Sequence, residues 1–227
     1  MAGTRHSLDP IFKPRSVAVL GASATPGSVG SILMHNLLTN PFGGVVYPVN
    51  PKRVQVHGVR CYADLAAVPE VPDLVLIATP AAGVPDLITG CVARGVPAAI
   101  IISAGFSELG REGKALEKRV RDIARGKMRI IGPNCLGVIH PPSNLNASFA
   151  ASMARPGKVA LLSQSGAICT SILDWANTTH VGFSTFVSVG AMLDVDFADL
   201  IDYFADDPQT RSIIFYMESI GDVRKFL

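Results

Sequence analysis

Short apolar, β-branched runs alternate along this chain with segments of helical period, and this alternation constrains the fold more than any other feature. Strand-like runs that alternate with helix-like segments are typical of βαβ units and a parallel sheet. The expected strands are residues 16–23, 45–50, 73–80 and 98–105, the run 128–140, and then 158–166, 183–190 and 211–219. The expected helices are residues 28–39, 84–94, 113–125, 167–177 and 196–204.

The predicted fold class is α/β, with two units in sequence. Residues 1–140 are expected to form a Rossmann-like domain with a parallel sheet, and residues 158–227 a partial flavodoxin-like α/β domain. Residues 141–157 are rich in Pro, Ser, Asn and Ala without a clear period, so we interpret them as a linker. Three strands are few for a doubly wound domain, so the second unit is expected to be truncated here or completed by another chain.

Composition narrows the function classes. Hydrophobic residues make up 48% of the chain and charged residues 17%, which favours either a sheet covered on both faces or an interface to a missing partner. The net charge of +2 comes without a block of like charges, which argues against nucleic-acid and membrane-surface roles. The four cysteines form no CxxC pair, so we expect neither a disulfide framework nor a metal site, and a reducing, cytoplasmic setting fits best. No segment approaches the roughly 20 apolar residues that span a bilayer.

A glycine-rich turn, Gly21–Gly30, joins the first expected strand to the first expected helix. Backbone N–H groups and the positive end of a helix dipole at such a turn can receive a phosphate. The turn departs from GxGxxG because Ser23 stands at the second glycine position and the spacing to Gly27 and Gly30 is longer. The alternative is an ordinary turn that closes a strand onto its helix.

The end of the second expected strand helps to identify the ligand. NAD sites place a carboxylate there to bind a ribose hydroxyl, whereas this chain has Asn50, Pro51, Lys52 and Arg53. Cations at this place suit a phosphorylated ribose, either the 3′-phosphate of coenzyme A (CoA) or the 2′-phosphate of NADP. The alternative is a pair of solvated surface cations.

Two further features lie in the second unit. Residues 163–167, SQSGA, form a second strand-to-helix turn that could hold an anion, or could simply carry a serine N-cap. Glu218 follows an apolar run, where a buried carboxylate is costly without a partner, although the residue could equally be exposed at a strand end.

Five motifs in order carry a resemblance to a known family. They are LDPIFKPRSVAVLGAS, YPVNPK, SAGFSELG, IIGPNCLG and LLSQSGA. With these motifs the chain resembles the NDP-forming acyl-CoA synthetases, namely the CoA-binding half of ADP-forming acetyl-CoA synthetases and of succinyl-CoA ligase α subunits. The likeness extends over essentially the whole chain.

The resemblance implies roles for individual residues. CoA would be bound by the nucleotide-end loop, by Lys52 facing its phosphates, by the turns after the third and fourth strands, and by the loop near the pantetheine thiol: Gly21, Ser23, Gly27, Lys52, Thr79, Pro80, Ser103, Asn134 and Cys135. For Cys135 a small buried thiol is the plainer interpretation. A phosphate would be bound by Ser163, Gln164, Ser165 and Gly166. Glu218 would be catalytic by orienting the histidine that accepts the phosphoryl group.

The resemblance also implies an activity and partners. The complete enzyme would convert acyl-CoA, ADP and phosphate to acid, CoA and ATP through acyl phosphate and phosphohistidine. ATP or ADP and Mg would be bound by an ATP-grasp domain or subunit of an oligomer, not by this chain. None of the five histidines lies in the family's Ser-His-Thr-Gly context, so the chain alone is expected to be inactive.

Two alternatives remain open at this point. One is a CoA-sensing or acyl-CoA-sensing region of a protein fused to a GNAT acetyltransferase, which the residues beyond position 227 would distinguish from a ligase. The other is an NADP-dependent oxidoreductase, which would explain Lys52 and Arg53 but not the SQSGA segment.

Overall fold

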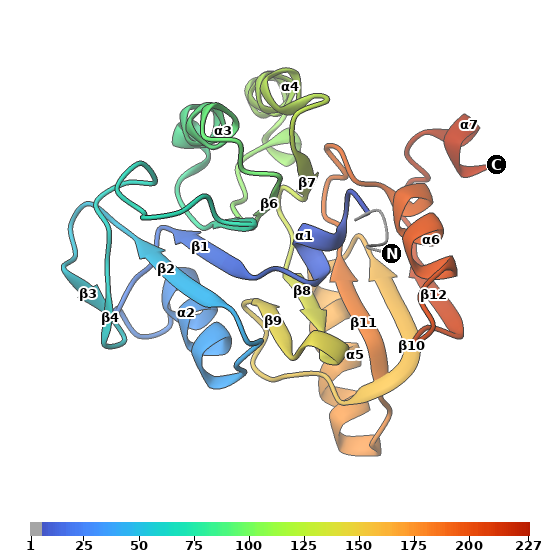
Figure 1. Ribbon diagram of the computed structural model, residues 1–227. Helices are drawn as coiled ribbons and strands as arrows, with labels where there is room; N and C mark the ends of the chain where they lie inside the picture. The colour runs from blue at the N-terminus through green and yellow to red at the C-terminus, as the bar shows by residue number, and fades with distance from the viewer. Residues whose placement is uncertain (1–5) are drawn as a thin grey trace, which may run out of the picture.

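The computed structural model describes residues 6–227 and contains two five-stranded sheets that lie side by side (Figure 1). The first sheet has the order β2 (Val45–Val49), β1 (Ser16–Leu20), β5 (Leu74–Ile77), β6 (Ala98–Ile101) and β7 (Arg129–Ile131). Every pairing in it is parallel, as the alternation of strands and helices predicts. A separate hairpin of β3 (Gln55–Val56) and β4 (Val59–Arg60) follows β2.

Helices cover this sheet on both faces. They are α1 (Asp9–Phe12), α2 (Val29–Thr39), α3 (Val84–Ala93) and α4 (Arg111–Ala124). Side chains in β1 alternate between two apolar clusters, because successive residues of a strand point to opposite faces. Val17 and Val19 pack in the cluster that includes α2, whereas Ala18 and Leu20 pack in the cluster that includes α3 and α4. All residues of β1 are buried.

The second sheet is mixed. Its order is β12 (Ser212–Tyr216), β10 (Pro156–Ser163), β11 (Phe183–Ser188), β8 (Gly137–His140) and β9 (Leu145–Ser148). The first three strands are parallel, while β8 and β9 pair antiparallel. Helix α5 (Gly166–Thr179) packs on one face and α6 (Phe197–Ala205) on the other, and α7 (Val223–Phe226) follows β12.

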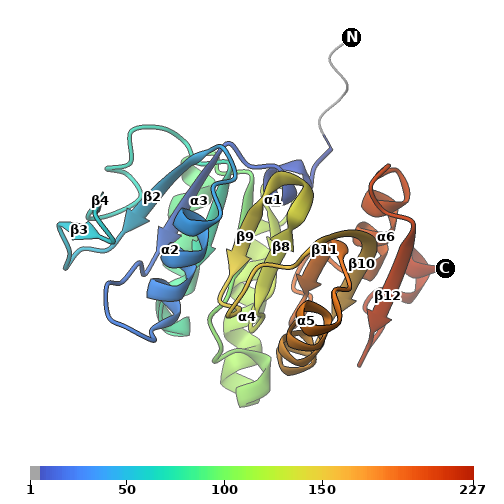
Figure 2. The ribbon, with the colours of Figure 1, turned by 90° about the horizontal axis from the view of Figure 1, so that it is seen from below.

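The structure differs from the sequence-based expectation between residues 128 and 157. The run 128–140, expected as one strand with a turn, is two strands in different sheets, β7 and β8. The segment 141–157, expected as a linker without regular structure, contains β9. Strand β9 lies beside α2 (Figure 2), where Asn36 Nδ2 donates to the carbonyls of Ser148 and Ala150, both at 2.9 Å.

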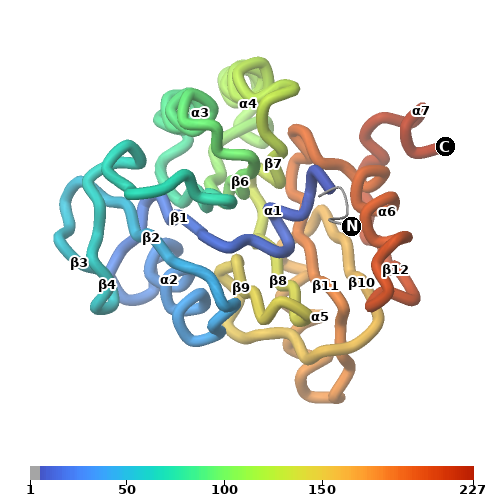
Figure 3. Tube along the Cα trace, in the orientation of Figure 1, coloured from blue at the N-terminus to red at the C-terminus, as the bar shows by residue number. Residues whose placement is uncertain are grey.

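One apolar cluster joins the two sheets. It contains Val19 of β1 together with Leu162 of β10 and Phe204 of α6. Helix α1 also lies between the sheets (Figure 3), and its Phe12 ring stacks on Tyr203 of α6 with ring centroids 4.9 Å apart. The two predicted units therefore share a core. Among residues 6–227, no helix combines the length and apolar character that crossing a bilayer requires.

Candidate functional site

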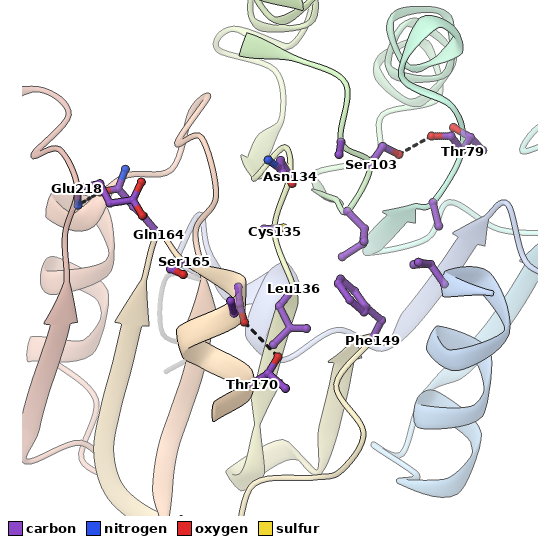
Figure 4. A pocket seen from close by; sticks show the side chains of 16 residues that line it. Thr79, Ser103, Asn134, Cys135, Leu136, Phe149, Gln164, Ser165, Thr170 and Glu218 are labelled. Atoms are coloured by element: carbon purple, nitrogen blue, oxygen red, sulfur yellow. Dashed lines mark hydrogen bonds between the residues drawn. The ribbon is translucent and has the colours of Figure 1, made fainter. Parts of the chain in front are cut away.

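A pocket of about 780 Å³ lies between the two sheets, at the carboxyl ends of their parallel strands (Figure 4). Ligands of open α/β sheets bind at this edge. Many of the predicted site residues line the pocket, namely Thr79, Ser103, Asn134, Cys135, Gln164, Ser165, Gly166 and Glu218. The remaining predicted residues, Gly21, Ser23, Gly27, Lys52, Pro80 and Ser163, are not among its lining residues.

The turn after β1 is shaped by two close approaches of the backbone. A Cβ at Gly21 would lie 2.5 Å from the carbonyl oxygen of Ala78, and Gly21 has a φ of +91°. A Cβ at Gly30 would lie 2.0 Å from the carbonyl oxygen of Gly21. Glycine at position 21 lets the end of β1 approach the chain after β5, and glycine at position 30 lets the first turn of α2 pack on the end of β1. Gly30 was noted in the motif but not predicted as a site residue.

Asn50 connects the end of β2 to this turn. Its Nδ2 donates to the carbonyl of Ala22 at 2.8 Å, and its Oδ1 accepts from the backbone N–H of Lys52 at 2.9 Å. Lys52 is therefore held next to the glycine-rich turn with its side chain exposed. Within residues 6–227, no ion pair involves Lys52 or Arg53.

The turns after β5 and β6 meet in the pocket. Ser103 Oγ donates to the carbonyl of Thr79 at 2.5 Å, and the carbonyl of Ser103 accepts from the backbone N–H of Asn134 at 3.0 Å. Thr79 Oγ1 is buried and has no hydrogen-bond partner within residues 6–227. A buried hydroxyl without a partner is costly, so this atom is available for a hydrogen bond with a ligand in the pocket.

Cys135 is buried at the back of the pocket. Its Sγ donates to the carbonyl of Ile101 at 3.4 Å, and burial raises the pKa of the thiol to about 12. A thiol with that pKa stays protonated at neutral pH and is a poor nucleophile. These observations favour a packing role for the Cys135 side chain.

The second turn, between β10 and α5, leaves backbone donors for an anion. Ser165 Oγ accepts from Ile168 N at 3.3 Å and so caps α5. Ser163 Oγ accepts from Ser165 N at 3.1 Å and is buried, so Ser163 supports the turn from behind. The N–H groups of Gly166 and Ala167 have no partner within the described residues. Unpaired N–H groups at the positive end of a helix dipole attract anions, so this turn has the chemistry that an anion site requires.

Gln164 holds the chain around Glu218. Its Oε1 accepts from the backbone N–H groups of Glu218 at 2.6 Å and Ser219 at 2.8 Å, and its Nε2 donates to Ser219 Oγ at 3.1 Å. These contacts engage the side-chain amide with protein groups and fix the backbone at Glu218 on the rim of the pocket. The Glu218 side chain is exposed, and not buried behind the apolar strand.

Fold and pocket together define a class of protein. It has a Rossmann-like parallel sheet, and the pocket at the carboxyl ends of its strands is also lined by the N-terminus of α5, which packs on the second sheet. Family models agree with this division, because residues 15–141 match a model described as a CoA binding domain. Residues 156–227 match a Succinyl-CoA ligase like flavodoxin domain. The chain belongs to the CoA binding domain family.

Curated relatives and solved structures extend this assignment. The chain is 42% identical to the α subunit of acetate–CoA ligase [ADP-forming] I of Pyrococcus furiosus, covering 97% of this chain and 49% of that one. It is 43% identical to the acetate–CoA ligase [ADP-forming] of Methanocaldococcus jannaschii, covering 99% of this chain but 31% of that one. The chain therefore spans half or less of the length of these relatives.

Two solved structures have closely similar folds. The crystal structure of PH0766 from Pyrococcus horikoshii OT3 superposes with a TM-score of 0.93 at 42% identity, covering 96% of this chain and 50% of that one. The dinucleotide forming acetyl-coenzyme A synthetase 1 of Ca. Korarchaeum cryptofilum, solved with phosphate and ADP, gives 0.91 at 38% identity, covering 96% and 47%. Neither the acetyltransferase-linked sensor nor the NADP-dependent oxidoreductase is supported by these similarities.

Proposed function

We propose that this chain binds CoA and acyl-CoA as part of an ADP-forming or GDP-forming acid–thiol ligase. The observation that carries the proposal is the pocket itself, because strand-end residues of the first sheet and the N-terminus of α5 line one cavity. The first would hold the carrier thiol and the second the phosphate that attacks the thioester. A domain that only binds a nucleotide would not need the N-terminus of α5 in its pocket.

The described residues divide between the two ends of CoA. The turn at Gly21, Ser23 and Gly27 would receive the nucleotide end, with Lys52 facing its phosphates and Pro80 beside it. Thr79, with its unpaired Oγ1, and Ser103 would bind the pantetheine amides. Asn134 lines the pocket between Ser103 and α5. CoA bound along these residues would have its thiol near Ser165.

The second turn would stabilise the transferring phosphate. Ser165 and the N–H groups of Gly166 and Ala167 lie together at the N-terminus of α5. Developing negative charge is stabilised at such a terminus. Ser163 and Gln164, both predicted as phosphate ligands, support the turn through their own hydrogen bonds. Glu218, on the rim of the same pocket, would orient the phosphorylated histidine.

The whole reaction needs parts beyond this chain. We propose that acyl-CoA, ADP and phosphate give acid, CoA and ATP through acyl phosphate and phosphohistidine, with an ATP-grasp domain or subunit binding the nucleotide and Mg. The relative from Pyrococcus furiosus is called a subunit, which supports an oligomeric assembly. The four cysteines are all free and buried, which supports a reducing, cytoplasmic setting.

Calorimetry with CoA and 3′-dephospho-CoA tests the binding proposal on this chain. CoA should bind more tightly, by about tenfold for one charge-assisted contact to the 3′-phosphate. Lys52→Ala should narrow that ratio. Lys158→Ala removes an exposed cation near the amino end of β10, at the opposite end of the strand from the pocket, and should leave the ratio unchanged. Equal affinities in the wild-type chain would remove the role of Lys52, and no binding of CoA would contradict the proposed function.

A further inference from the structure

One end of the pocket is apolar and has no assigned occupant. Figure 4 shows the side chains of Leu136, Phe149 and Thr170 converging below Ser165, away from Glu218. Leu136 is buried in the apolar cluster beneath α5, against which Phe149 packs. Thr170 lines this end of the pocket, and its Oγ1 donates to the carbonyl of Gly166 at 3.1 Å, so the hydroxyl is already engaged within the helix.

The chemistry of a thioester places its acyl group here. The carbonyl carbon must meet the attacking phosphate at the N-terminus of α5, and the acyl chain starts at that carbon. Thr170 lies one turn along the same helix from Gly166. We infer that Leu136, Phe149 and Thr170 form the acyl subsite and that Phe149 limits the length of the acyl chain, an inference that rests on the proposed binding of acyl-CoA.

Phe149 acts as a wall between two cavities. It lines the pocket of about 780 Å³ and also a neighbouring cavity of about 430 Å³. The neighbouring cavity is bounded by Ile32 and His35 of α2 and by Ala151. Removing the Phe149 ring would join the two spaces and let a longer chain pass into the second.

The lack of cationic side chains in the pocket lining favours one chemical class of acyl group. The ionisable residues that line the pocket are Cys135 and Glu218, and no Lys, Arg or His is among the lining residues. A carboxylate at the end of an acyl chain would thus be desolvated without a cation to pair with it, which is costly. The subsite therefore takes uncharged acyl groups.

The test measures CoA, acetyl-CoA, butyryl-CoA, hexanoyl-CoA and succinyl-CoA binding to the 227-residue chain by calorimetry, each expressed relative to CoA. In the wild-type chain hexanoyl-CoA and succinyl-CoA should bind more weakly than butyryl-CoA. Phe149→Ala should raise the relative affinity of hexanoyl-CoA by roughly tenfold, as expected for two newly buried methylenes. Thr170→Leu should have the opposite effect and weaken butyryl-CoA.

Controls separate this inference from the proposed function and from loss of packing. Phe42→Ala removes a partly buried ring of the same apolar core that does not line the pocket, and it should leave the ratios unchanged. Phe149→Leu provides a milder variant if Phe149→Ala does not fold. Two results would contradict the acyl subsite in a chain that binds CoA. One is a chain-length preference that is the same in the Phe149 and Thr170 variants as in the wild-type chain. The other is a change in Phe42→Ala as large as the change in Phe149→Ala. If CoA itself does not bind, the proposed function fails first.

Discussion

Gln164 has a different role in the structure from the one that its sequence motif predicts. Its place in SQSGA led to the prediction of a phosphate ligand, yet its side-chain amide holds the backbone of Glu218 and Ser219. A role through Glu218 makes Gln164 a positioning residue. Ser165, the next residue, lines the pocket and caps α5 by accepting from the backbone N–H of Ile168.

Substituting Gln164 should loosen the turn that carries Glu218. Gln164→Ala removes the hydrogen bonds that the backbone amides of Glu218 and Ser219 donate to its Oε1, each of about 1 kcal/mol, so both amides should exchange at least tenfold faster with deuterium. Gln209→Ala, which alters an exposed turn, serves as the matched control. Unchanged exchange at both amides would show that the contact does not hold the turn.

His140 should make stability depend on pH. Burial lowers the pKa of its imidazole from 6.5 to about 4, and its Nδ1 has no partner within the described residues. The unfolded chain binds a proton at higher pH than the folded chain, so stability is lost as the pH falls from about 6.5 toward 4. The loss amounts to about 3 kcal/mol, and it should be absent in His140→Gln. Urea unfolding at several pH values measures it, and parallel curves for both proteins would contradict it.

At the scale of elements, the contact of α2 with β1 depends on Gly30. An added methyl group would overlap the carbonyl oxygen of Gly21, whereas at Gly90, on the exposed side of α3, nothing lies within 4 Å. Gly30→Ala should destabilise the fold by about 3 kcal/mol and weaken CoA binding. Gly90→Ala should stabilise it by up to about 1 kcal/mol, through better helix propensity. Thermal unfolding of both variants measures these changes in stability. An unchanged stability of Gly30→Ala would contradict the close approach of Gly30 to Gly21.

Sequence patterns recovered most elements but not their assembly. The parallel strands and their helices were predicted because each pairs an apolar run with a helical period. The helix predicted over residues 196–204 is α6, Phe197–Ala205, and Asp196 is its N-cap. Strands β8 and β9 were not separated from their surroundings, because an apolar run does not tell which sheet a strand joins. The hairpin of β3 and β4 was missed because two-residue strands carry no period.

The sequence motifs predicted which residues belong to the candidate site, but not how their side chains are arranged. Thr79, Ser103 and Asn134 follow strand ends, which is a signal that sequence carries. The unpaired Thr79 Oγ1, the amide contacts of Gln164 and the wall formed by Phe149 depend on side-chain packing across two sheets. Phe149 was not predicted because it lies in the segment interpreted as a linker.

At the scale of the whole molecule, the shared core should make the two sheets unfold together. Arg129 of β7 adds to this connection by pairing with Asp194 at 2.9 Å and Asp199 at 3.0 Å. We expect one cooperative transition, with Trp175 fluorescence reporting on the second sheet and amide exchange in β1 on the first. Two separated transitions would show that the sheets are independent domains.

We propose that CoA lies along the carboxyl-end edge of the first sheet, with its thiol at the N-terminus of α5. Diffraction from crystals of this chain grown with CoA measures this directly. We expect the nucleotide beside the turn at Gly21 and Lys52, and the sulfur between Asn134 and Ser165. CoA bound elsewhere on the molecule, or a nicotinamide nucleotide taking the pocket when both are offered, would contradict it.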